Sequence, residues 1–142
     1  MQLMSLTARI DHPASQVWSI VSDFGGLKRW NPAVTTCSQE GTGVGALRTF
    51  QAGPATVCER IEALDQANLS ISYSIVSGSS LKVRQALLTI SVKPLDASSC
   101  ELYWGMQGEP DGVEAEELKQ VLHKRYSGRI EDLRRVLAGN GD

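Results

Sequence analysis

Residues 34–108 alternate between apolar and polar side chains, and this stretch lies between two segments with helical spacing. The clearest case is LSISYSI at residues 69–75, where apolar side chains alternate with serines. A period of two residues places these two sets on opposite faces of a strand. Short links such as Gly53-Pro54 and Ser77-Gly78 separate the alternating runs. The pattern predicts antiparallel hairpins with one apolar and one polar face.

Seven strands and two helical regions are expected along the chain. Pro13 suits the first turn of a helix that Gly25-Gly26 ends, and residues 27–30 predict one further short turn before Pro32. Residues 113–138 place leucines at helical spacing, and Gly139 is a suitable stop. The expected strands cover residues 2–10, 34–40, 46–51, 55–65, 68–77, 81–94 and 99–108.

The glycine-rich stretch GTGVGALRTF, at residues 41–50, is interpreted as a turn. A phosphate-binding loop has G-x-G-x-x-G spacing and leads into a helix N-terminus, where free N–H groups hold the anion. Here the spacing is G-x-G-x-G, and the residues that follow are typical of a strand. Glycines between two strands usually provide positive φ. The stretch therefore predicts a hairpin rather than a nucleotide site.

Composition excludes several classes of protein. The formal net charge of −2 over 142 residues gives no reason to expect nucleic acid as a partner. No apolar run approaches the roughly 18 residues of a membrane span, and the N-terminal residues lack the pattern of a signal peptide. We therefore expect a cytoplasmic chain without integral membrane association.

Cysteine and histidine usage argues against a metal centre or a disulfide framework. The three cysteines, Cys37, Cys58 and Cys100, are far apart in sequence, as are His12 and His123. An odd number of scattered cysteines suits reduced thiols in a core. We expect no metal and no cofactor, and the sequence leaves a homodimer open.

These patterns predict an α+β fold in one domain spanning residues 1–142. A curved antiparallel sheet of seven strands would wrap around the long C-terminal helix, with two short helices between the first and second strands. A strongly curved sheet and a single helix rarely close tightly. A cavity is therefore expected between them, and such cavities are the usual ligand sites.

Four sequence segments in this order resemble the START-like (SRPBCC) superfamily of polyketide cyclase/dehydrase-like proteins, Bet v 1-type allergens and abscisic-acid receptors. They are HPASQVWSIVSDFGGLKRWNP, GTGVGALRTF, CERIEALD and LSISYSI. The resemblance extends from Met4 to the last helix and implies the helix-grip fold. It also implies a hydrophobic ligand between sheet and helix, because the superfamily includes aromatase/cyclases, lipid carriers and hormone receptors. The resemblance does not identify that ligand.

The resemblance also bears on particular residues. The hormone receptors have a ligand-facing glutamate at the position that Glu59 matches. Other members often carry a tyrosine near the position of Arg84, where this sequence departs from the family. Gly53-Pro54 matches the receptors' mobile gate in position.

Strand parity independently predicts which side chains face the cavity. Glu59 shares its parity with Val57 and Ile61, and Arg84 shares its parity with Ala86. Two charges on an apolar face need an explanation, because burying an unpaired ion is costly. Either Glu59 and Arg84 form a buried pair or lie at the wet mouth of the sheet, or they anchor a polar group of a ligand.

Three functions remain open at this stage. The first is binding of a hydrophobic or aromatic small molecule. The second is a polyketide cyclase/aromatase-type enzyme, with Glu59 as the candidate catalytic base and Tyr73 as an acid. The third is a partner-binding module like the chaperone activators. The expected ligand-binding residues are Trp30, Thr35, Val57, Glu59, Ile61, Tyr73, Ile75, Arg84, Ala86, Trp104, Met106, Leu122, Tyr126 and Ile130.

Overall fold

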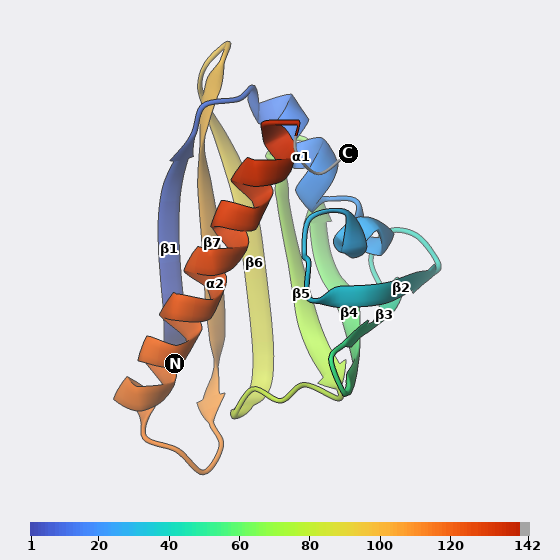
Figure 1. Cartoon of the computed structure of the whole chain (residues 1–142), viewed down its shortest axis with the longest axis vertical. Coiled ribbons are helices and arrows are strands. Elements are labelled where there is room, and N and C mark those ends of the chain that lie inside the picture. The colour runs from blue at the N-terminus through green and yellow to red at the C-terminus, as the bar shows by residue number, and fades with distance from the viewer. Residues whose placement is uncertain (140–142) are drawn as a thin grey trace.

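The computed structural model describes residues 1–139, and within them seven strands form one antiparallel sheet (Figure 1). The strands are β1 (Gln2–Ile10), β2 (Val34–Glu40), β3 (Leu47–Ala52), β4 (Ala55–Asp65), β5 (Ser70–Ser77), β6 (Val83–Asp96) and β7 (Ser99–Pro110). Their spatial order is β1-β7-β6-β5-β4-β3-β2. The predicted meander is confirmed, and β1 pairs with β7 at one edge. Residues 140–142 of the expected 1–142 domain lie outside the described part.

Helices occupy the hollow side of this sheet. The helix α1 (Ala14–Val21) and the 3-10 helix η1 (Phe24–Arg29) connect β1 to β2, and α2 (Ala115–Leu137) follows β7. Figure 1 shows α2 lying across the sheet, while β2 and β3 run almost crosswise to β1, β6 and β7. The sheet therefore curves around the helix, and the predicted helix-grip architecture is confirmed.

The apolar stripe of α2 packs on the sheet. Leu118, Leu122, Ile130 and Leu133 are buried, while Tyr126 is half-buried within the same stripe. These positions recur at three or four residues, which places them on one face of the helix. Burial of each large apolar side chain contributes about 1.5–3 kcal/mol, so this stripe holds α2 against the sheet.

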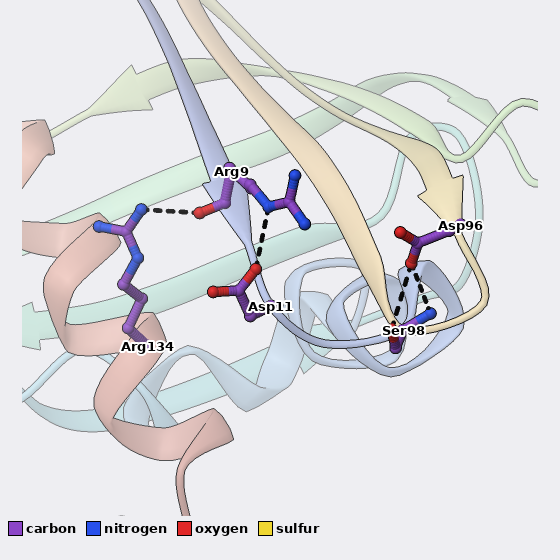
Figure 2. Close-up of polar contacts among 5 residues, drawn as sticks. All are labelled: Arg9, Asp11, Asp96, Ser98 and Arg134. Atoms are coloured by element: carbon purple, nitrogen blue, oxygen red, sulfur yellow. Dashed lines mark hydrogen bonds and ion pairs between the residues drawn. The ribbon is translucent and has the colours of Figure 1, made fainter.

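Polar contacts at the C-terminal half of α2 tie the helix to the end of β1 (Figure 2). The Arg134 guanidinium donates from Nη2 to the backbone oxygen of Arg9 over 2.8 Å, and Arg9 Nε donates to Asp11 Oδ1 over 3.0 Å. Nearby, Asp96 accepts hydrogen bonds from Ser98 in the turn between β6 and β7. All of these groups are exposed, so each contact contributes little to stability.

The glycine-rich stretch closes the β2–β3 hairpin, as its spacing predicted. Gly41, Gly43 and Gly45 have φ values of +82°, +72° and +91°. Side-chain-bearing residues rarely adopt this conformation, which explains the alternating glycines.

A different glycine fixes the loop between β5 and β6. Gly78 has φ of +86°, and a Cβ atom there would lie 1.8 Å from the backbone oxygen of Thr56 on β4. The loop therefore runs directly over β4 only because residue 78 has no side chain. A matched glycine is Gly43, which has φ of +72° and no atom within 4 Å of its Cβ position.

Gly78→Ala is expected to lower the free energy of unfolding by about 3 kcal/mol or more, because the methyl group collides with backbone. Gly43→Ala should cost only about 1 kcal/mol, which is the strain of positive φ alone. Urea denaturation of both variants measures the difference. Equal losses for the two variants would contradict the close approach of Gly78 to β4.

Candidate functional site

A cavity of about 360 Å³ lies between α2, η1 and the strands β3, β4, β5 and β7. Ligand pockets commonly measure about 300–1,000 Å³, so the space suits a small molecule. The lining residues are Leu27, Trp30, Asn31, Ala33, Arg48, Phe50, Ala52, Gly53, Ala55, Val57, Glu59, Tyr73, Ile75, Ser79, Ser80, Leu81, Trp104, Arg125, Tyr126 and Arg129.

A buried ion pair forms part of the cavity wall. Arg48 on β3 and Glu59 on β4 are directly opposite each other in register, and each is 6% exposed. Arg48 donates from Nε to Glu59 Oε1 over 2.7 Å, and its Nη2 lies 2.6 Å from the same oxygen in an ion pair. Its third nitrogen, Nη1, donates to the backbone oxygen of Phe24 on η1 over 3.2 Å. One guanidinium thus joins two strands to the 3-10 helix.

Aromatic rings surround the guanidinium of Arg48. Its central carbon lies 4.1 Å from the ring centre of Phe24, 4.9 Å from that of Tyr73 and 5.9 Å from that of Phe50. A cation over aromatic faces is attracted by their quadrupoles. Burial is the largest single effect on the pKa of Arg48 and would lower it, but the charge and hydrogen bond of Glu59 together with smaller effects of Tyr73 and Cys37 outweigh burial, and the pKa rises. Arg48 is therefore positively charged in the folded protein.

Tyr73 and Tyr126 also line the cavity. Burial, and after it the negative charge of Glu59, raises the pKa of both phenols, that of Tyr73 well above its usual value. Both phenols therefore keep their protons at neutral pH. They can donate hydrogen bonds inside the cavity, but they cannot act as bases there.

Two tryptophans and Tyr126 form an aromatic wall. Ring centres of Trp104 and Tyr126 lie 4.8 Å apart, and those of Trp30 and Trp104 lie 5.8 Å apart. Such tilted and edge-on pairs are favourable and leave ring surface for a flat ligand. Within residues 1–139 the buried indole N–H of Trp104 has no hydrogen bond of good geometry, and the nearest acceptor that affects it is the Tyr73 hydroxyl, whose pKa this N–H lowers against the larger effect of burial.

The structure brings part of the predicted set to the cavity. Trp30, Val57, Glu59, Tyr73, Ile75, Trp104 and Tyr126 line it. A second group is buried in the core and does not line this space: Ile61, Ala86, Met106, Leu122 and Ile130. The prediction that these side chains face inward was correct. Packed side chains leave no open space next to them, so they do not line the cavity.

Two predicted residues lie elsewhere, and their placement was wrong. Arg84 is exposed and donates from Nη2 to the backbone oxygen of Pro110 over 3.3 Å. The register of β6 shifts between Arg84 and Leu87, where Gln85 has φ of +55°. This bulge reverses strand parity, so Arg84 cannot share the face of Ala86. Of the alternatives left open for Glu59, a buried pair is present, but its partner is Arg48 and not Arg84.

Thr35 is the other misplaced residue. It is exposed and donates from Oγ1 to the backbone oxygen of Gln51 over 3.3 Å. Its neighbour Val34 is buried, and strand alternation therefore turns Thr35 away from the core.

Arg48, Arg125 and Arg129 were missed. Arg48 shares the parity of Ala46 and Phe50, so the alternation applied to the other strands would have found it in residues 46–51. Arg125 and Arg129 flank Tyr126 on α2. Their four-residue spacing places them on one side of the helix, next to a tyrosine that was predicted to face the cavity.

Two further properties of the described residues concern metal ligands and membrane-spanning helices. Within residues 1–139, no three His, Cys, Asp or Glu side chains cluster so as to hold a metal ion. No helix in the same range has the length and apolar character needed to cross a bilayer.

Glu59→Gln or Arg48→Met should each lower the free energy of unfolding by about 3–5 kcal/mol, because each leaves a buried charge without its partner. Arg84→Ala is the matched control at an exposed arginine, and its cost should stay within about 0.5 kcal/mol. Chemical denaturation measures all three variants. An Arg48→Met loss no larger than that of Arg84→Ala would contradict a buried pair.

The raised pKa of Tyr73 predicts a pH dependence of stability. Once unfolded, this phenol ionises near its usual value of 10.0, whereas the folded chain holds it protonated to higher pH. Ionisation therefore lowers the free energy of the unfolded state above pH 10, and the free energy of unfolding falls as pH rises toward the folded pKa.

Tyr73→Phe should show a smaller loss of unfolding free energy between about pH 9 and pH 11 than the parent chain, because phenylalanine has no proton to release. Urea denaturation at a series of pH values measures this difference. Parallel pH profiles for variant and parent would show that the phenol is not held in its protonated form.

Comparison with known proteins places this site in a family. A family model described as polyketide cyclase/dehydrase and lipid transport matches residues 1–138. An uncharacterized Bacillus thuringiensis protein is 25% identical with a TM-score of 0.82, over 93% of this chain and 96% of that chain. XoxI from Bacillus cereus is 24% identical with a TM-score of 0.83, over 93% and 92% of the two chains.

A functionally named structure shares the fold at lower identity. The Zhui aromatase/cyclase from Streptomyces sp. R1128 is 20% identical with a TM-score of 0.73, over 97% of each chain. The resemblance drawn from the four sequence segments is thereby confirmed. A sheet that grips one long helix is common to these structures, and the chain belongs to the polyketide cyclase/dehydrase and lipid transport family.

Proposed function

We propose that the chain binds one small hydrophobic or aromatic molecule in the cavity between the sheet and α2. The observation that carries the proposal is the cavity of about 360 Å³ beside the wall of Trp30, Trp104 and Tyr126. Aromatic rings bury large apolar areas against a flat ligand at little conformational cost. The hydroxyl of Tyr73, protonated at neutral pH, supplies a donor that orients such a ligand.

Membership of the family supports this proposal at a coarser level, since its description includes both cyclase chemistry and lipid transport. The binding unit is the START-like domain expected over residues 1–142. Its inner wall has an ion pair that is satisfied within the protein, so a ligand need not neutralise it.

The cyclase alternative depends on Glu59 as a base. That carboxylate is paired with the Arg48 guanidinium through Oε1, and the lining contains neither histidine nor cysteine among residues 1–139. Proton transfer in catalysis usually relies on a positioned side chain that can change its protonation state at working pH. Binding is therefore the better-supported function, and turnover of a bound ligand remains an outcome of the test below.

Ala55→Trp should abolish binding of N-phenylnaphthylamine, a neutral apolar dye whose fluorescence rises in a dry site. Ala55 lines the cavity, and an indole there would occupy the space that the dye needs. Ala67→Trp is the control, because Ala67 lies exposed in the turn between β4 and β5. Titration of each purified variant by dye fluorescence measures the effect.

Loss of dye binding in Ala55→Trp alone supports the cavity as the binding site. Equal binding by both variants, or none by the parent chain, would overturn the proposal. A dye altered chemically during the titration, seen by mass spectrometry, would favour the enzyme instead.

A further inference from the structure

The cavity lining carries more positive than negative charge. Among the described residues it includes Arg48, Arg125 and Arg129, with Glu59 as its acidic member. The lining residues are otherwise uncharged. The three guanidiniums differ in how fully carboxylates neutralise them, and this difference determines where the excess positive charge lies.

The inner part of the cavity is electrically balanced. Arg48 and Glu59 pair at 2.6 Å, and both are buried. Two opposite charges at this distance leave only a dipole for a ligand to meet. The excess positive charge therefore belongs to the arginines of α2.

Those two arginines lie at the outer rim of the cavity, and their positive charges are not fully neutralised by nearby carboxylates. Arg129 pairs with Asp132 at 2.6 Å, but Arg135 takes the other oxygen of the same carboxylate at 2.8 Å. Two guanidiniums thus share one negative charge. Arg125 is exposed and makes no ion pair within residues 1–139. The rim of the cavity carries a net positive charge.

The rim charge is adjacent to the aromatic wall. Tyr126 directly follows Arg125, and the positive charges of Arg125 and Arg129 both lower the pKa of its phenol, against the larger effect of burial. Tyr126 in turn packs on Trp104 at 4.8 Å. Low-dielectric walls around a cleft focus such a field and raise the local concentration of anions.

We propose that the ligand is an amphipathic anion, with a flat apolar body against Trp104 and Tyr126 and a carboxylate or similar group at Arg125 and Arg129. This inference rests on the proposed function and adds the chemical class of the ligand. A planar guanidinium matches a carboxylate through paired N–H groups, and the open rim leaves both partners partly solvated. The same placement leaves the apolar body in the dry interior.

The test compares two competitors that displace N-phenylnaphthylamine. Naphthoate and naphthamide have the same ring system. Naphthoate carries a charged carboxylate, whereas naphthamide carries a neutral amide. Naphthoate is expected to displace the dye at about tenfold lower concentration than naphthamide, as charge-assisted hydrogen bonds exceed neutral ones. Arg125→Gln should reduce this preference several-fold, and Arg125→Gln with Arg129→Gln should abolish it.

Lys124→Gln is the matched control, because Lys124 is an exposed cation on the same helix that does not line the cavity. It should leave the naphthoate preference unchanged. Circular dichroism of every variant checks that each one is folded. The dye carries no charge of its own, and its binding constant is measured for each variant so that the displacement by naphthoate and naphthamide is compared within that variant. For Lys124→Gln, which lies outside the cavity lining, this constant should differ less than twofold from that of the parent chain.

The outcomes separate the two proposals. If the dye binds but naphthoate and naphthamide displace it equally well, the proposal of an anionic ligand is overturned, while the cavity remains a binding site. A naphthoate preference that Lys124→Gln removes as fully as Arg125→Gln shows a general surface field and also overturns it. Absence of dye binding by the parent chain overturns the proposed function, and this inference with it.

Discussion

The pairing of Arg48 with Glu59 is the constraint on which the cavity depends. Two charges that are each 6% exposed are tolerable only if both are satisfied within the protein. The arginine meets this need with a hydrogen bond and an ion pair to Glu59 and a hydrogen bond to the backbone oxygen of Phe24. It thereby fixes β3 against β4 and holds η1 over the sheet. The aromatic rings of Phe24 and Tyr73 then take positions set by this one guanidinium.

From this arrangement follows a division of the cavity into three zones. The ion pair forms an inner zone with balanced charge, and the rings of Trp104 and Tyr126 form an apolar wall. The rim of α2 supplies under-compensated positive charge through Arg125 and Arg129. A balanced interior does not repel an apolar body, whereas a positive rim attracts an anionic group. This division of the cavity is the basis of the proposed binding of a molecule with both parts.

Much of the fold could be predicted because burial on one sheet face imposes a strict alternation. The seven strands and the cavity wall around Tyr73 follow from that rule, while the long helix follows from apolar residues repeating every three or four positions. Arg48 also obeys it and could have been found. Arg84 could not be placed, because the bulge at Gln85 reverses parity and a non-glycine residue with positive φ leaves no mark in the sequence. Which inward positions line open space and which fill it depends on packing in three dimensions.

The most direct measurement of the central claim is a two-dimensional ¹H–¹⁵N NMR titration of the chain with naphthoate, read at the tryptophan indole N–H signals. Trp30 and Trp104 line the cavity, while Trp18 lies outside it and donates to Gln66 over 2.8 Å. The account predicts that the signals of Trp30 and Trp104 shift on binding and that the signal of Trp18 stays in place. A shift confined to Trp18, or no shift at saturating ligand, would contradict a binding cavity between the sheet and α2.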